Sequence, residues 1–136
     1  MSVLLGGAAG ALITFVLTSG RWWWRRRRLA RVAAKQLAPR LSALNTAVTD
    51  ALADHSWQPL EGAELTDHAL PGLTITIANS LPRHATDPFI DGVLAVHELD
   101  RARDSFGLTA PRERERIETC RRRIETATMI ATNLAD

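Results

Sequence analysis

The chain begins with a long run of residues that carry no charge. Residues 2–20 read SVLLGGAAGALITFVLTSG and contain no ionisable side chain. As a helix that rises about 1.5 Å per residue, this run would be roughly 28 Å long, close to the ~30 Å hydrocarbon core of a bilayer. The rest of the chain offers little apolar surface to cover such a helix on all sides. We therefore predict a transmembrane helix over residues 1–21.

Aromatic and basic residues follow the apolar run almost directly. Three tryptophans come first and four arginines next. This is the order expected where a helix leaves a bilayer, because aromatic rings favour the headgroup region and cations favour the water beyond it. A cleaved secretory signal would carry its basic residues before the apolar run. We expect a membrane interface formed by Trp22, Trp23, Trp24, Arg25, Arg26, Arg27 and Arg28.

The charges are divided unevenly along the chain. Residues 21–40 contain eight basic side chains and no acid, so the first 40 residues carry a charge of +8. The remaining 96 residues hold nine basic and all 15 acidic side chains, which gives −6. Because positively charged flanks stay on the cytoplasmic side, we predict a single-pass protein of the cell membrane with its amino end outside and residues 21–136 in the cytoplasm.

Small residues recur every four positions within the predicted span. Gly6, Gly10, Thr14 and Thr18 would share one side of the helix. A side without bulky groups lets a second helix approach closely, and threonine hydroxyls can form hydrogen bonds across the contact. These four residues predict a face for helix–helix packing in the membrane, although glycine is also common in membrane helices that have no such role.

Residues 22–40 form a basic collar after the span. On a helix, Arg28, Arg31 and Lys35 would lie on one side, with apolar residues on another. We expect anionic lipid headgroups as partners, since each cation near such a leaflet contributes about 1 kcal/mol. Nucleic acid is not expected, because no nucleic-acid-binding motif follows the cations. Binding of the basic collar to an acidic protein is an alternative that the sequence leaves open.

Apolar spacings of three and four residues predict three further helices, over residues 41–54, 87–106 and 110–134. Pro39 removes a backbone donor, so we expect a kink or a new helix start there, which would act as a hinge. Thr86 and Asp87 can cap the second helix, and Pro111 can begin the third. The side chains expected to face inward are Leu37, Leu41, Leu44, Val48, Leu52, Phe89, Ile90, Val93, Leu94, Val96, Leu99, Ile117, Cys120, Ile124, Ala127, Ala131 and Leu134.

Residues 55–86 differ in composition from their surroundings, because prolines and glycines punctuate them. Within this region, residues 73–77 read LTITI and alternate apolar with polar β-branched side chains, which fits a short strand. An extended loop packed against the helices fits equally well. The sequence does not decide whether such a strand would pair within the chain or between chains.

These patterns together predict a mainly α-helical protein. One transmembrane helix (1–21) and the basic collar (22–40) precede a small helical domain (41–136), which has about three helices, an irregular middle region and one short strand or loop. On the last helix, oppositely charged residues lie four apart and predict an exposed, ion-paired face. The pairs are Arg114 with Glu118, Glu118 with Arg122, and Arg121 with Glu125.

Residues that could carry chemistry are few. His97, Asp100 and Asp104 would share one face of a helix and could hold a divalent ion, or the two carboxylates could pair with Arg101 and Arg103. No sequence motif for catalysis or cofactor binding is present, so we expect no enzyme and no cofactor. The single cysteine, Cys120, excludes a disulfide within the chain, and its role is open.

The sequence therefore predicts a membrane-anchored interaction module, an adaptor or scaffold whose helical domain binds a membrane or cytoplasmic protein, including another copy of itself. An accessory subunit of a larger membrane complex is the alternative. A membrane-tethered enzyme or metal-binding protein that uses His97, Asp100 and Asp104 is a more remote one. The identity of the partner and the stoichiometry are left open.

Overall fold

The computed structural model describes residues 2–136, with side chains from Trp23 onward. Four α-helices and one short 3-10 helix make up the fold, and no strand occurs in residues 2–136. The prediction of a mainly α-helical chain is confirmed. In chain order the elements are α1 (Ser2–Asp54), η1 (Gln58–Leu60), α2 (Ala69–Ala78), α3 (Arg83–Ser105) and α4 (Pro111–Ala135).

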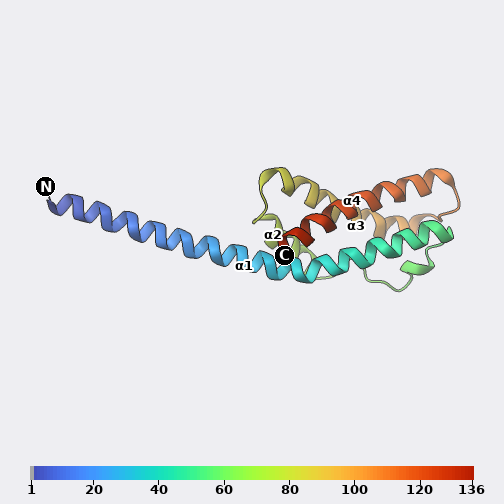
Figure 1. Cartoon of the computed structure of the whole chain (residues 1–136). Helices are drawn as coiled ribbons and strands as arrows, with labels where there is room; N and C mark the ends of the chain where they lie inside the picture. Colours follow the sequence, from blue (N-terminus) through green and yellow to red (C-terminus); the bar gives the residue numbers. More distant parts are fainter. Residues whose placement is uncertain (1) are drawn as a thin grey trace.

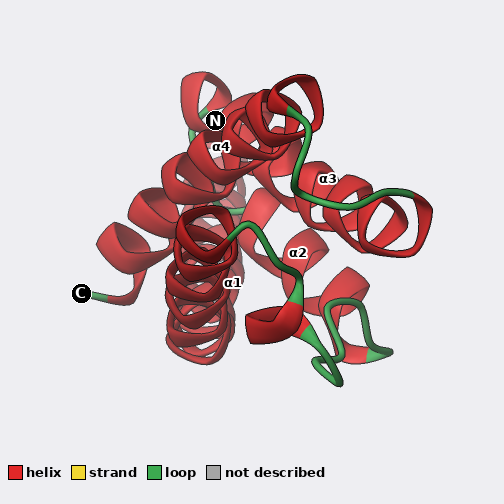
Figure 2. Cartoon of the chain, turned by 90° about the vertical axis from the view of Figure 1, so that its right-hand side faces the viewer, coloured by secondary structure: helices red, strands yellow, loops and turns green. Residues whose placement is uncertain are grey.

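The second half of α1 forms a bundle with α3 and α4, while the first half of α1 extends away from it (Figure 1). Helix α4 packs against both α1 and α3, and the short α2 packs against α1 and α3 at one side. Figure 2 shows the helices of the bundle from the far end. The connection between α3 and α4 lies at the end farthest from the amino terminus, and α4 returns the chain toward α2 (Figure 1).

Helix α1 continues through Pro39 as one helix, so the predicted new helix start there is wrong. The alternative prediction, a kink, agrees with the change of direction in the cyan part of α1 where the helix enters the bundle (Figure 1). Pro39 itself is exposed, whereas its neighbours Leu37, Ala38 and Leu41 are buried in the core. The proline therefore removes a backbone bond only on the side that faces water, where the freed carbonyl of Lys35 can be hydrated. Packing on both sides of the proline keeps the two halves of α1 in one continuous helix.

The core contains side chains from all four α-helices and the connecting segments. Helix α4 contributes Ile117, Cys120, Ile124, Ala127 and Ala131, all at the positions that the spacing predicts. Helix α1 contributes Leu37, Leu41 and Val48, whereas Leu44 and Leu52 are half-buried at its edge.

Two of the residues predicted to face inward on α3 do not. Ile90 is 37% exposed and Leu94 is 52% exposed. The core face of α3 instead includes Gly92 and Ala95 beside Val93 and Val96. Because these small residues let α3 lie close to α4, the buried face of α3 is rotated away from Ile90 and Leu94, which remain at the surface.

Both predictions for residues 73–77, a short strand and an extended loop, are wrong, because these residues lie inside α2. Leu70 and Ile77 are buried seven residues apart, as on one face of a helix. Asp67 accepts hydrogen bonds from the backbone N–H groups of Ala69 and Leu70 and so caps the helix. A helix closes its own backbone hydrogen bonds, whereas a lone strand would have needed a partner.

Helix α3 begins at Arg83, four residues before the predicted start, and it passes through Pro88. Pro82 precedes the helix, and the Thr86 hydroxyl donates to the Pro82 carbonyl at 3.1 Å rather than capping a later start. A proline in the second turn of a helix loses one backbone bond, and this loss is offset here by burial of the adjacent Phe89.

Side chains from α3 hold the loop that follows α1. The Arg103 guanidinium donates to the carbonyl oxygens of Leu60 and Ala63 at 2.9 and 2.8 Å. At the end of α3, the indole N–H of Trp57 donates to the Phe106 carbonyl at 2.7 Å. These contacts join the irregular residues 55–66 to the far end of the bundle.

From Trp23 to Asp136, the part with described side chains, no helix has a segment long and apolar enough to span a membrane. The predicted span over residues 1–21 lies outside this part, as do Gly6, Gly10, Thr14 and Thr18. Both therefore stay predictions.

Gly92 marks the closest approach of α3 to α4. A Cβ atom at this position would clash with the Ala127 Cβ and would lie 2.5 Å from the Arg123 carbonyl oxygen. Both obstacles are on α4, and one of them is backbone, which cannot swing aside. The absence of a side chain at Gly92 therefore sets the distance between these two helices.

We expect Gly92→Ala to lower the free energy of unfolding by about 1–3 kcal/mol, because the two helices must move apart. Gly72→Ala in α2 is the matched control, since a Cβ there meets nothing within 4 Å. It should raise stability by about 0.5 kcal/mol through a better helix propensity. Denaturant unfolding of the full chain in detergent, followed by far-ultraviolet circular dichroism, measures both. Equal stability of the two variants would contradict the close approach.

Candidate functional site

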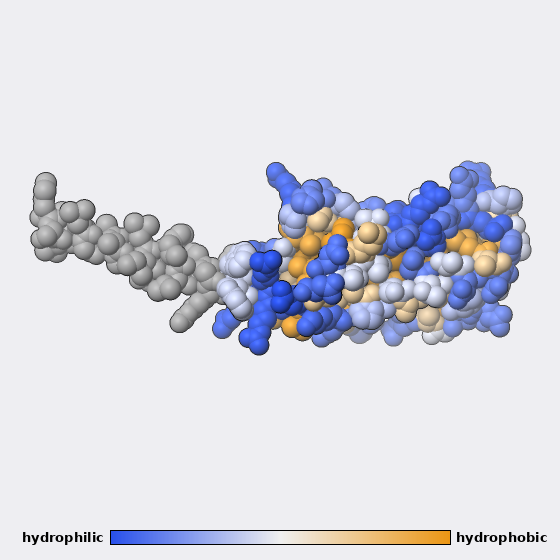
Figure 3. All heavy atoms as spheres, in the orientation of Figure 1, coloured by the Kyte–Doolittle hydropathy of each residue, from blue (hydrophilic) through white to orange (hydrophobic). Residues whose placement is uncertain are grey.

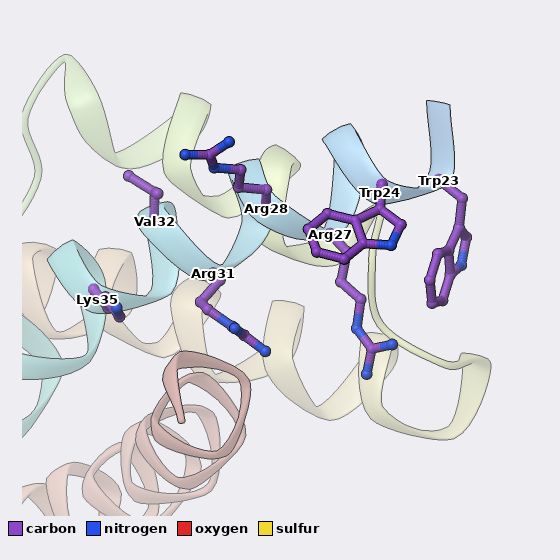
Figure 4. Close-up of a pocket in the computed structure, with 7 residues that line it drawn as sticks. All are labelled: Trp23, Trp24, Arg27, Arg28, Arg31, Val32 and Lys35. Carbon is purple, nitrogen blue, oxygen red and sulfur yellow. The ribbon is translucent and has the colours of Figure 1, made fainter. Parts of the chain in front are cut away.

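A surface of tryptophan and basic residues covers α1 where it enters the bundle (Figure 4). Trp23 and Trp24 are 54% and 69% exposed, far more than expected for rings of this size in a free-standing protein. All of the residues come from one helix, so this is an open surface and not an enclosed pocket. We call it the Trp–Arg surface; it comprises Trp23, Trp24, Arg27, Arg28, Arg31, Val32 and Lys35.

The structure places most of the predicted interface residues on or beside this surface. Trp23, Trp24, Arg27 and Arg28 belong to it, Arg25 is exposed next to it, and Arg26 is half-buried toward the bundle. The side chain of Trp22 lies outside the described residues. The order of tryptophans and arginines after the apolar run was the signal in the sequence, and their role as a membrane interface stays a prediction.

The cations of the Trp–Arg surface are not neutralised by the bundle. Among the described side chains, no ion pair involves Arg27, Arg28, Arg31 or Lys35. The Arg27 guanidinium lies over the Trp23 ring, 5.0 Å from its centroid, which is a cation–π contact. The remaining positive charge is available to an anionic partner.

The opposite side of the same helical segment is buried. Ala30, Ala33, Ala34 and Leu37 contact the core, which leaves only Leu29 and Val32 as exposed apolar residues of this stretch. The predicted basic collar therefore does not have a free apolar side along residues 30–38, because the bundle covers it. Only its basic and aromatic side faces outward.

A turn from another part of the chain contacts the basic segment of α1 at Arg26, beside the Trp–Arg surface. The Ser80 hydroxyl donates to the backbone carbonyl of Arg26 at 3.3 Å. Ser80 lies between α2 and α3, so this hydrogen bond places the start of α3 beside the basic segment of α1. Nothing in the sequence pattern predicted this contact, because the two residues are 54 positions apart.

A second exposed surface lies between α2 and α3. Ile75, Ile90 and Leu94 are 61%, 37% and 52% exposed and line a shallow groove with Pro71 and His97. We call it the α2–α3 groove. Apolar surface is visible among the charged residues of the bundle in Figure 3. Clustered apolar exposure of this kind is typical of protein contacts.

The predicted metal-binding group does not form. Asp100 accepts a hydrogen bond from Arg103 at 2.9 Å, which is one of the two alternatives that the sequence left open. His97 lines the α2–α3 groove. Over residues 23–136, no group of three or more histidine, cysteine, aspartate or glutamate side chains is arranged to hold a metal ion.

Two of the three predicted ion pairs on α4 are present. Arg122 pairs with Glu118 at 3.5 Å, and Arg121 pairs with Glu125 at 3.1 Å. Arg121 also donates to Glu118, and this hydrogen bond lowers the pKa of that carboxyl despite the opposing effect of burial. Arg114 does not pair with Glu118, because its guanidinium donates to the Leu52 carbonyl at the end of α1.

An ion pair between helices was missed by the sequence analysis. Arg123 donates to Asp91 at 2.9 Å and to Glu98 at 2.7 Å, so it joins α4 to two residues of α3 that lie about two turns apart. The seven-residue spacing of Asp91 and Glu98 on α3 was the available signal. The arginine is 23% exposed, and the contact therefore belongs to the packing of α3 on α4 rather than to a free surface.

Cys120 lies between α3 and α4 and is only 3% exposed. Its thiol is 3.6 Å from a carboxylate oxygen of Glu98, to which it can donate. Burial, and after it the negative charge of Glu98, raises the pKa of the thiol above its usual value. The thiolate, which is the reactive form, is therefore disfavoured.

We expect Cys120 to react with a maleimide at least about 100-fold more slowly in the folded protein than in the unfolded chain, because both access and ionisation are hindered. The rate is measured by mass spectrometry of the full chain in detergent near neutral pH. The same sample in denaturant is the control. Similar rates in both samples would contradict the buried position of the thiol.

The chain matches no protein-family model, no curated protein and no solved structure. The assignment of a functional site therefore depends on the residues and geometry of this chain. Two surfaces qualify on these grounds, the Trp–Arg surface and the α2–α3 groove.

Proposed function

We propose that this protein is a single-pass, membrane-anchored interaction module. Residues 1–21 would cross the cell membrane with the amino end outside, and the helical bundle would lie in the cytoplasm. The observation that carries the proposal is the continuity of α1 from Ser2 to Asp54. One helix contains the apolar run, the tryptophans and arginines, and the residues that pack into the core.

This continuity leaves no flexible linker between anchor and bundle. The apolar run ends at Gly20, and the first buried residue of the bundle is Ala30. At about 1.5 Å per residue, the two are roughly 15 Å apart along the helix. The bundle would therefore be held at a fixed distance from the headgroups, in contrast to a domain on a mobile tether.

The charge and exposure of the Trp–Arg surface support contact with anionic lipids. Exposed tryptophan rings favour the headgroup region, and the unpaired cations Arg28, Arg31 and Lys35 are attracted to the negative cytoplasmic leaflet. A nucleic acid would find the same cations, but they would already lie against the membrane. Lipid headgroups are therefore the partner that we propose for this surface.

The α2–α3 groove supports a protein partner. The exposed Ile75 and Leu94 are the kind of side chains that a second protein would cover. Helix α2 leads directly into the turn that contacts Arg26, so the groove lies on the part of the bundle near the basic segment. A partner in the same membrane can reach this side, and we propose a membrane protein as the occupant.

The exposed groove is also consistent with the second candidate function, an accessory subunit of a larger membrane complex. In that case the partner would be a permanent neighbour in a larger complex, and the exposed apolar side chains would be covered at all times. We do not propose an enzymatic activity, because His97, Asp100 and Asp104 do not form a metal-binding group in the described part of the chain.

The anchor is tested by extraction of native membranes with alkaline carbonate. We expect the full chain to remain in the membrane pellet, because residues 1–21 would be surrounded by acyl chains. In intact cells, a cysteine introduced by Ser2→Cys should react with a membrane-impermeant maleimide, while one introduced by Thr109→Cys should not. Release into the carbonate supernatant would contradict the anchor, and the reverse labelling would contradict the orientation.

The groove is tested by crosslinking in native membranes. We expect Leu94→Glu to abolish the crosslinked product, because it places a charge in an apolar contact, with little effect on stability at an exposed position. Met129→Glu is the matched control, since Met129 is 61% exposed on α4 and does not line the groove. Loss of the product in both variants, or in neither, would contradict a partner at this surface.

Purification of the protein alone separates the two candidates. As an interaction module, it should be folded in detergent as a monomer or homodimer, as measured by light scattering and circular dichroism. As a permanent subunit, it should unfold or aggregate until a partner is present, because a stable bundle would require the partner to cover the groove.

A further inference from the structure

We propose that the turn between α2 and α3 is a second binding site for anionic lipid headgroups, separate in sequence from the Trp–Arg surface. We call residues 79–84 the α2–α3 turn; it comprises Asn79, Ser80, Leu81, Pro82, Arg83 and His84. The inference rests on the proposed membrane anchor and names a further lipid contact of the bundle.

The position of the turn follows from its hydrogen bond to α1. Ser80 donates to the carbonyl of Arg26, which is six residues after the end of the apolar run. Along a helix this corresponds to about 9 Å. Each headgroup layer is roughly 5–8 Å thick, so the turn would lie at the outer edge of that layer.

The chemistry of the turn suits an anionic surface. Pro82, Arg83 and His84 are exposed, and no acidic residue occurs in the chain between Asp67 and Asp87. Arg83 adds a cation to the turn whose Ser80 hydroxyl contacts the Arg26 carbonyl. The turn and the basic segment of α1 therefore form a positive surface that includes two separate elements.

The turn is ordered by its own hydrogen bonds. The backbone N–H groups of Ser80 and Leu81 donate to carbonyl oxygens at the end of α2, and Ala85 donates to Pro82 at the start of α3. Contact with lipid would therefore require little further ordering of the backbone. A preorganised site loses less conformational entropy on binding than a mobile loop does.

Two contacts would fix the orientation of the bundle on the membrane. The Trp–Arg surface lies on α1, and the α2–α3 turn lies between α2 and the start of α3. A bundle attached only through α1 could rotate about the axis of that helix, whereas a second contact restricts this rotation. The α2–α3 groove would then point in a constant direction toward its neighbour.

The test uses the full chain in nanodiscs with a nitroxide label and a nickel-chelating lipid, which relaxes labels that lie near the headgroups. The label is attached through Asn79→Cys in a Cys120→Ala background. Thr109→Cys, at the far end of the bundle, is the control for distance, and Arg25→Cys is the control for the anchor. Circular dichroism confirms that each variant is folded.

We expect at least a two-fold greater relaxation enhancement at position 79 than at position 109. It should increase when phosphatidylserine is added to phosphatidylcholine and should fall by about half with Arg83→Glu. Enhancement at position 25 but not at 79 would overturn this inference and leave the anchor intact. Enhancement at neither position would contradict the anchor itself. Enhancement at 79 that does not change with phosphatidylserine or with Arg83→Glu would overturn the recognition of anionic lipid.

Discussion

The packing of one side of α1 on the bundle is the constraint on which the rest of the structure depends. Leu37, Leu41 and Val48 are buried on this side, and their packing keeps α1 helical on both sides of Pro39. With that side covered, the basic and aromatic residues before Pro39 can only face outward. The exposed side of α1 is thus defined by the burial of the opposite side, and the Trp–Arg surface follows from the core.

The uneven distribution of charge fits this arrangement. The positive charge lies on the extended part of α1 and the end of the bundle next to it. The acidic residues lie later in the chain, and several of them form ion pairs within the bundle. Asp91 and Glu98 pair with Arg123, Asp67 pairs with Arg40, and Glu118 pairs with Arg121. Much of the charge of the bundle is therefore neutralised by ion pairs within it. The positive charge of the Trp–Arg surface is not, and it is available to a partner.

The sequence predicts what depends on local periodicity and fails where distant packing decides. The five core residues of α4 repeat every three or four positions, so their burial can be predicted without knowing which helix they pack against. In contrast, the alternation in residues 73–77 predicts a strand or an extended loop, whereas the cap from Asp67 and the burial of Ile77 favour the helix that forms. Ile90 and Leu94 were placed in the core because the close approach at Gly92 cannot be foreseen from α3 alone. The sequence singled out the tryptophans and arginines of the Trp–Arg surface, but the approach of Ser80 to Arg26 required the tertiary structure.

The central claim is that α1 is one helix from the basic segment into the bundle, and a distance measurement across Pro39 tests it most directly. Nitroxide labels at Arg28→Cys and Thr46→Cys, in a Cys120→Ala background, would lie on the same exposed side of α1, five helical turns apart. In lipid bilayers, double electron–electron resonance should give one narrow distance near 27 Å, the length of an unbroken helix between them. A broad distribution that extends well below this distance would show a hinge at Pro39 and would contradict the account.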